Sequence, residues 1–171
     1  MPRTHRSTKA DADSGDAIKM LMADHKEVSA RFDQYRKMCE DVASDDEKQA
    51  LAQEICAMLT VHTTIEEEMF YPAARDVIEE AHLVDEALVE HASAKDLIAQ
   101  IEGSSPDEEL YDAKVEVLGE YVKHHVKEEE SELFPQAKKA KLDVEELGAR
   151  MMKRKHELMA EVGLAEESAA H

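Results

Sequence analysis

The sequence predicts an all-α protein, an up-down-up-down four-helix bundle with an extra short C-terminal helix. Its 171 residues are 43% hydrophobic and 36% charged, with only 5 Gly and 4 Pro, a composition that favours helices over strands and turns. Apolar residues recur at three- and four-residue intervals through four long segments, which is the period of an amphipathic helix. Short loops join these segments, so antiparallel packing is the simplest arrangement. A chain of this length supports one domain.

The first helix follows a polar leader. Residues 1–15 carry no periodic apolar positions, so we expect them to be disordered, and we expect the bundle to occupy residues 16–140. The first helix begins at Asp16 and ends near residue 41. Its inward face carries one histidine among apolar residues and consists of Ile18, Leu21, His25, Val28, Phe32 and Tyr35.

The next two helices have local start or stop signals. Ser44 is followed three residues later by Glu47, a capping box that predicts the start of the second helix. Pro72 has no backbone N–H, so we expect this helix to stop or kink near it. Gly103 is placed to end the third helix. The inward faces carry Leu51, Ile55, Leu59, His62, Glu66 and Met69 on the second helix, and Val84, Ala87, Leu88, His91, Ala94, Ile98 and Ile101 on the third.

The fourth helix also has a predicted cap. Ser105, Pro106 and Glu108 supply an N-cap, a first-turn proline and the third capping-box position. The helix should run to Pro135, which cannot continue the hydrogen-bond ladder undisturbed. Its inward face carries Leu110, Val117, Leu118, Tyr121, His125, Glu129 and Leu133.

The C-terminal segment, residues 141–171, is expected to hold one more helix and a frayed tail. Asp143 and Glu146 are spaced to cap this helix, which should end near residue 162. Since the four longer helices complete a bundle without it, we expect it to lie across the outside.

Charge and the ends of the chain exclude several classes of partner. The formal net charge is −19, from 21 basic and 40 acidic residues, and this surplus repels phosphate backbones and anionic lipids. We therefore expect neither a nucleic-acid nor a membrane partner. No run reaches the roughly 20 apolar residues of a membrane span, and the start has no apolar signal segment, so we expect a cytoplasmic protein. Cys39 and Cys56 form no CxxC motif and are expected to be reduced and structural.

An internal repeat is the most informative feature of the sequence. The segment HTTIEEEMFYP, from His62 to Pro72, matches HVKEEESELFP, from His125 to Pro135, in the placement of the histidine, two glutamates, an aromatic residue and the proline. Each copy is preceded by a helix with one inward histidine, which is His25 or His91. The chain therefore contains two similar helical hairpins.

The repeat places metal-ligating side chains at one level of the bundle. Residues four apart on a helix share a face, so His62 lies with Glu66 and His125 lies with Glu129. Antiparallel packing brings the two pairs together. Four imidazoles with two bridging carboxylates suit a pair of iron ions, although zinc or manganese also fit this donor set. Without a metal, such a buried cluster would cost several kcal/mol per unpaired group.

These motifs carry a family resemblance. Asp24-His25, HTTIEEEMFYP, Glu90-His91 and HHVKEEESELFP resemble the hemerythrin-like (HHE cation-binding) family, from about residue 16 to residue 139. The resemblance implies a four-helix bundle around a carboxylate- and oxo- or hydroxo-bridged pair of iron ions. The ligands that it implies are His25, His62, Glu66, His91, His125 and Glu129.

The fourth helix offers a second reading, because His124 and Glu128 are also four residues apart. Alignment of the two half-motifs on their prolines selects His125 and Glu129. His124 is then rotated by about 100° toward solvent or a helix interface. The other glutamates of the two acidic runs are expected on the solvated side, and so are four further histidines, His5, His82, His156 and His171.

The sequence departs from the family's oxygen carriers, which place two histidines four apart on the third helix. Here Ala87 and Lys95 occupy the positions four away from His91. One ligand fewer favours a reactive or sensing site with two accessible metals over reversible oxygen carriage. Tyr121 precedes His125 by one turn, and it is either a core residue or a group that approaches the metals.

The resulting functional hypothesis is a non-haem di-iron protein that reacts with or senses dioxygen, peroxide or nitric oxide. Its small-molecule partner is accordingly a diatomic gas or a peroxide, and a catalase-like consumption of peroxide would make it an enzyme. Two alternatives stay open. One is an iron storage, delivery or iron-centre repair protein, and the other is a structural bundle stabilised by zinc. The sequence identifies no protein partner.

Overall fold

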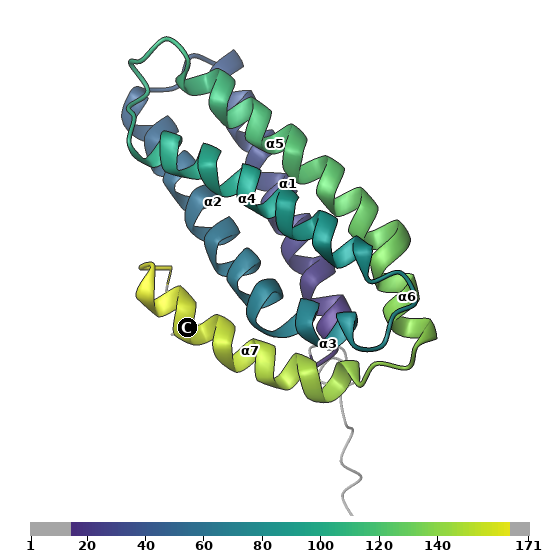
Figure 1. Cartoon of the computed structure of the whole chain (residues 1–171). Coiled ribbons are helices and arrows are strands. Elements are labelled where there is room, and N and C mark those ends of the chain that lie inside the picture. The colour runs from purple at the N-terminus through teal and green to yellow at the C-terminus, as the bar shows by residue number, and fades with distance from the viewer. Residues whose placement is uncertain (1–14, 165–171) are drawn as a thin grey trace, which may run out of the picture.

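The computed structural model describes residues 15–164, and this part of the chain is helical, without β-strands (Figure 1). Most of the predicted leader and the last seven residues of the predicted tail, 165–171, lie outside the described residues. The elements in order are α1 Ala17–Glu40, α2 Asp45–Ile65, η1 Glu66–Phe70, α3 Tyr71–Arg75, α4 His82–Glu102, α5 Tyr111–Glu128, η2 Glu129–Leu133, α6 Phe134–Lys139 and α7 Val144–Glu161.

The long helices form the predicted antiparallel bundle. Helix α1 packs against α2 and α5, and α4 packs against α5 and α2. The C-terminal helix α7 lies outside this bundle, against α1 and α2, as Figure 1 shows. It has 18 residues, the same length as α5, so it is a full-sized helix that covers one face of the bundle.

Three of the predicted helix starts are present. The side chain of Asp16 accepts hydrogen bonds from the backbone N–H groups of Ile18 and Lys19. Ser44 caps α2 and Asp143 caps α7 in the same way. Each cap satisfies backbone donors that the first turn of a helix leaves unpaired.

The predicted start of the fourth helix is wrong by several residues. Helix α5 begins at Tyr111, and Leu110, which was expected on the inward face, is 61% exposed. The Ser105 N–H donates to the Glu108 carboxylate, which is half of the capping box. The Ser105 hydroxyl, however, bonds to Asp107 instead of the Glu108 N–H. The segment therefore closes as a turn, and the helix starts after it.

The two prolines do not end their helices. Pro72 and Pro135 follow π-helical turns, η1 and η2, in which the N–H of residue 71 or 134 bonds to the carbonyl five residues earlier. Each proline then stands in the first turn of the next helical segment, where no N–H donor is needed. The accepting carbonyls belong to Glu66 and Glu129. Both π turns thus begin at a predicted metal ligand, and π turns inside helices are frequent at functional sites.

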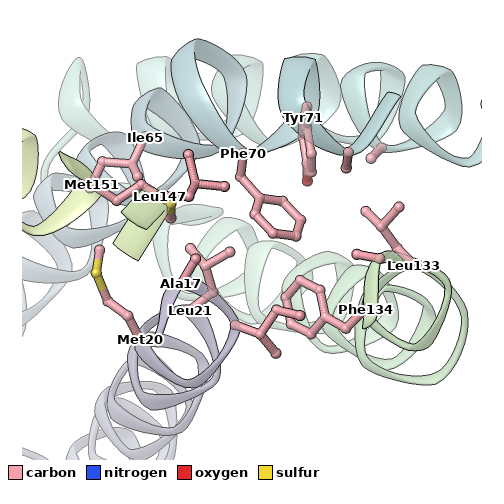
Figure 2. Close-up of a cluster of buried hydrophobic side chains, with 14 of the residues drawn as sticks. Ala17, Met20, Leu21, Ile65, Phe70, Tyr71, Leu133, Phe134, Leu147 and Met151 are labelled. Atoms are coloured by element: carbon pink, nitrogen blue, oxygen red, sulfur yellow. The ribbon is translucent and has the colours of Figure 1, made fainter. Parts of the chain in front are cut away.

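Two apolar clusters lie above and below the predicted ligands. On α1 and α4 the inward histidine separates buried residues of one cluster from those of the other, and α2 and the continuous segment from α5 to α6 also contribute residues to both clusters. The cluster beside α7 is drawn in Figure 2, where Phe70 and Phe134 meet edge to face with ring centroids 5.4 Å apart. The histidines therefore occupy a layer between the two apolar clusters, in the middle of the bundle.

Candidate metal centre

The four predicted histidines meet in the bundle interior, one from each long helix. The Nε2 atoms of His25 and His62 lie 3.2 Å apart, and those of His91 and His125 also lie 3.2 Å apart. The imidazoles therefore form two pairs. Each pair combines the two histidines of one helical hairpin.

The two predicted glutamates lie between these histidine pairs. Glu66 Oε1 is 2.5 Å from His62 Nε2 and 3.8 Å from His91 Nε2. Glu129 Oε1 is 3.3 Å from His25 Nε2, and its Oε2 is 3.0 Å from His125 Nε2. Each carboxylate thus reaches a histidine of both hairpins, which is the placement of a bridging ligand.

The chemistry of this donor set fits a pair of metal ions. Glu66 is 0% exposed and Glu129 is 3% exposed. Oε2 of Glu66 and Oε1 of Glu129 have no hydrogen-bond partner among the described residues. Buried carboxylates without donors are costly unless a cation compensates them. Two groups of ligand atoms, each spanning less than 4.8 Å, are assembled here: His25, His62, Glu66 and Glu129 form one, and Glu66, His91 and His125 form the other.

Carboxylates behind the histidines orient the rings. Asp24 lies 3.1 Å from His62 Nδ1, and Glu90 lies 3.2 Å from His125 Nδ1. Each of these acids directly precedes an inward histidine in sequence, yet it supports the histidine of the next long helix. Such contacts fix the tautomer that leaves Nε2 free for a metal.

The other two histidines are supported from the opposite hairpin. Glu67 lies 3.2 Å from His91 Nδ1, and Glu130 lies 3.2 Å from His25 Nδ1. The expectation that these two glutamates belong to the solvated side was therefore wrong. They follow the ligands Glu66 and Glu129 by one residue, and the histidines that they contact come from neighbouring helices.

Two lysines extend this second layer. Lys155 Nζ lies 2.7 Å from Asp24, and Lys95 Nζ lies 2.7 Å from Glu67. Burial raises the pKa of Asp24, but the hydrogen bond to His62 and the charge of Lys155 outweigh it, so the net pKa lies below the usual value. Lys155 belongs to α7, which therefore contacts the site as well as covering it.

Protons compete with metals for the same nitrogens. Burial is the largest single influence on His62 and lowers its pKa, but the neighbouring carboxylates Glu66 and Asp24 together outweigh burial and raise the pKa to about 10. Burial also lowers the pKa of His125. The hydrogen bonds to Glu129 and Glu90 favour the charged form, and the pKa rises to about 11. A bound metal must displace these protons, so metal binding depends on pH.

Tyr71 is a site residue that the sequence analysis missed. Its hydroxyl donates to Glu129 Oε2 at 2.6 Å and lies 3.1 and 3.2 Å from the Nε2 atoms of His91 and His125. Burial, followed by the charges of the two site glutamates, raises the pKa of Tyr71 well above its usual value. The phenol is labelled in Figure 2, at the edge of the apolar cluster.

The internal repeat contains the clue to this tyrosine. Tyr71 occupies the position that Phe134 occupies in the second copy. The Phe134 ring stacks on His25 with centroids 5.9 Å apart and an interplanar angle of 5°. One histidine pair therefore faces a hydroxyl, while the other faces an apolar ring.

The remaining sequence-based expectations have mixed outcomes. Tyr121 is 48% exposed, so it is not a core residue, and the phenol in contact with the ligands is Tyr71 instead. His124 has a 65% exposed side chain and points away from the centre, as the alignment on the prolines predicts. His82 and His156 are exposed, whereas His5 and His171 lie outside the described residues. Cys39 and Cys56 are free thiols.

An apolar cavity of about 90 Å³ adjoins the ligands. This volume admits only a few water-sized molecules. Its walls come from all four long helices and from α7, and they include Val28, Leu59, His62, His91, Ile98 and Met159.

Fold and site together define a helical-bundle protein with an interior histidine and glutamate metal-binding cluster. The hemerythrin HHE cation binding domain matches residues 16–137, and the chain belongs to this family. The crystal structure of a hemerythrin HHE cation binding domain-containing protein from Mycobacterium kansasii has the same fold. Its TM-score is 0.73 at 20% sequence identity, over 91% of this chain and 94% of that one.

A longer relative is also known. A protein named DNA nickase from Nostoc sp. is 33% identical over 132 residues. The match covers 77% of this chain and 35% of that protein, so the chain spans about a third of the relative's length. Among the described residues, no helix is both long and apolar enough to cross a membrane.

Proposed function

We propose that this protein binds two iron ions, bridged by Glu66 and Glu129, and that the pair reacts with dioxygen, peroxide or nitric oxide. The observation that carries the proposal is the position of these two carboxylates. Both are buried, both retain an oxygen without a hydrogen-bond donor, and each approaches histidines of both hairpins. A mixed imidazole and carboxylate set of this kind suits iron.

The two histidine pairs have separate roles in this proposal. His25 and His62 would hold one ion, and His91 and His125 the other. Iron bound here supplies one-electron chemistry toward small ligands. The Tyr71 hydroxyl stands beside the second pair and can donate a hydrogen bond or serve as a further ligand there.

The size and polarity of the cavity favour a small, weakly polar ligand. About 90 Å³ of mostly apolar space accommodates a diatomic gas or peroxide. The same volume does not favour bulk storage of iron. The apolar walls also limit the access of water to the centre.

The third helix supports a reactive or sensing role over reversible oxygen carriage. Ala87 is buried in the apolar cluster and offers no ligand, and Lys95 is committed to an ion pair with Glu67. A metal held by His25 and His62 would lack a neighbouring phenol, because Phe134, which stacks on His25, stands at the position of Tyr71.

The name of the longer relative does not extend to this chain. Nicking requires contact with a phosphate backbone, and a formal charge of −19 opposes such contact. The chain also corresponds to only about a third of that protein.

Metal analysis of matched variants tests the bridging assignment. We expect about two irons per chain in the wild type and fewer in Glu66→Ala and in Glu129→Ala. Glu68→Ala is the control, because Glu68 belongs to the same acidic run but pairs with Arg154 on the surface. Full iron content in both bridging variants would refute the assignment. A colourless zinc protein would favour the structural alternative, and rapid transfer of iron to a chelator would favour delivery or repair.

The reduced protein can be tested with each of the three candidate reactants in turn. Addition of oxygen, peroxide or nitric oxide should change the optical spectrum, and peroxide should be consumed. A long-lived oxygenated form that releases oxygen under vacuum would instead indicate a carrier.

A further inference from the structure

A second His-x3-Glu pair lies on the outer face of α5. His124 Nε2 is 3.1 Å from Glu128 Oε1 and 3.8 Å from Glu90 Oε2. Ligand atoms of the three residues lie within 4.8 Å of one another. One divalent cation with ligand bonds of about 2.0–2.2 Å spans a group of this size. Glu90 also contacts His125 through its other oxygen, so this exposed cluster adjoins the buried centre.

The repeat shows why a cation is expected on this face. Asp24 and Glu90 play equivalent parts, since each orients a histidine with one carboxylate oxygen. The second oxygen of Asp24 is paired with the ammonium group of Lys155 from α7. Among the described residues, the ion pairs of Glu90 are with the two histidines His124 and His125. Glu90 therefore lacks the lysine that neutralises its counterpart.

The first hairpin has no such cluster. Val61 and Ile65 occupy the positions that His124 and Glu128 occupy in the second copy. Both are buried in the apolar cluster that also contains residues of α7. In the first hairpin, α7 covers this face and the two residues are apolar. In the second hairpin, α7 does not cover the face, and the same positions carry His124 and Glu128.

A small acidic cavity borders both the outer cluster and the centre. This cavity of about 10 Å³, roughly the space of one water molecule, lies between α4 and α5. It reaches His125 and Glu129, and Oε1 of Glu129 is buried without a hydrogen-bond partner. Its other charged walls are Glu86, Glu90, Glu128 and Glu132. Carboxylates grouped in this way concentrate cations at the opening.

We propose that Glu90, His124 and Glu128 form a third metal site, which binds a divalent cation and passes it inward to Glu129 and His125. Two carboxylates and one imidazole suit Fe²⁺, Mn²⁺ or Zn²⁺, with the remaining positions filled by water. The transfer role rests on the proposed two-iron centre, whereas the outer site itself does not.

Calorimetric titration with Zn²⁺ tests the outer site. We expect the protein as purified to bind one more zinc ion than His124→Ala or Glu128→Gln, whatever metal the centre already holds. His82→Ala is the control, since it removes an exposed histidine elsewhere on α4. Equal zinc binding by the wild type and both cluster variants would overturn the site.

The uptake rate tests the transfer role. After chelation of all metal, we expect Fe²⁺ to enter the centre at least several-fold more slowly in His124→Ala than in the wild type or His82→Ala, with the same final iron content. Equal rates would overturn the transfer role. If the wild type itself takes up fewer than two irons, the two-iron proposal fails, and the zinc titration still decides the outer site.

Discussion

Replacement of Tyr71 by Phe isolates the contribution of one hydroxyl group to the centre. Tyr71 is 1% exposed, and its ring packs against His91 with centroids 5.3 Å apart. The substitution keeps this ring and removes the hydroxyl, with its hydrogen bond to Glu129 and its contacts with the Nε2 atoms of His91 and His125. A hydrogen bond to a charged group contributes about 1.5–3 kcal/mol. For a chain of this size, that loss lowers the Tm by about 3–12 °C.

Tyr35→Phe is the matched control. The Tyr35 hydroxyl donates to a carboxylate at 2.7 Å, and Tyr35 is 3% exposed, but its partner Asp112 lies away from the centre. Because the Asp112 side chain is 48% exposed, we expect a loss at the lower end of the same range. This variant should not alter the metal.

The assay combines thermal unfolding with the optical spectrum of the iron-loaded protein. We expect both variants to unfold at lower temperature than the wild type. Only Tyr71→Phe should change the visible spectrum and the rate of iron loss to a chelator. If Tyr71→Phe keeps the wild-type spectrum and iron retention, Tyr71 is a buried hydrogen-bond donor without influence on the metals, and its place in the site is wrong.

Three further predictions follow from single features of the site and its surroundings. His125→Ala should lose metal from the centre and thermal stability together, whereas His124→Ala should keep both irons of the centre. The reverse would mean that α5 is one residue out of register. The pKa values of His62 and His125 are raised from 6.5 to about 10 and about 11. The protein stripped of metal should therefore lose stability as the pH rises from about 6.5 toward 10, while metal affinity rises over the same range. Thermal melts measure the stability of the metal-free protein across this range, and competitive chelation measures its metal affinity. If stability and affinity changed in the same direction with pH, the prediction would be wrong. Gly148→Ala should lower the Tm, because a Cβ atom there would lie 1.8 Å from the backbone oxygen of Gly15; Gly119→Ala, which meets only a side chain at 3.1 Å, should cost less.

The placement of the six predicted ligands in one cluster was predictable because it depends on local geometry. A four-residue spacing aligns His62 with Glu66 in any α-helix, and the repeat supplies the same pair again. Antiparallel packing then brings the two pairs to one level. The apolar residues around each ligand already indicate that this level is buried.

The π turn explains why Tyr71 was not predictable in the same way. In a regular α-helix, a residue five positions after Glu66 lies about 140° around the axis, away from the ligand face. The π turn instead bonds the Tyr71 N–H to the Glu66 carbonyl, which brings the tyrosine back above the glutamate. The sequence shows the proline that follows but not the widened turn before it.

The second layer depends on contacts between helices. Glu67 and Glu130 lie about 100° from the ligand face of their own helices, so each helix alone places them toward solvent. Their partners, His91 and His25, come from other helices. Lys155 is more distant still, because α7 must first dock on α1 and α2.

The central claim is that six side chains hold a coupled pair of iron ions. Its most direct test is the electron paramagnetic resonance spectrum of the oxidised protein, compared with the iron content of the same sample. Two ferric ions bridged by an oxo or hydroxo group as well as by Glu66 and Glu129 would couple antiferromagnetically, so we predict about two irons per chain with almost no ferric signal. A strong signal from isolated ferric iron, or a preparation that contains one iron per chain, would contradict the paired centre.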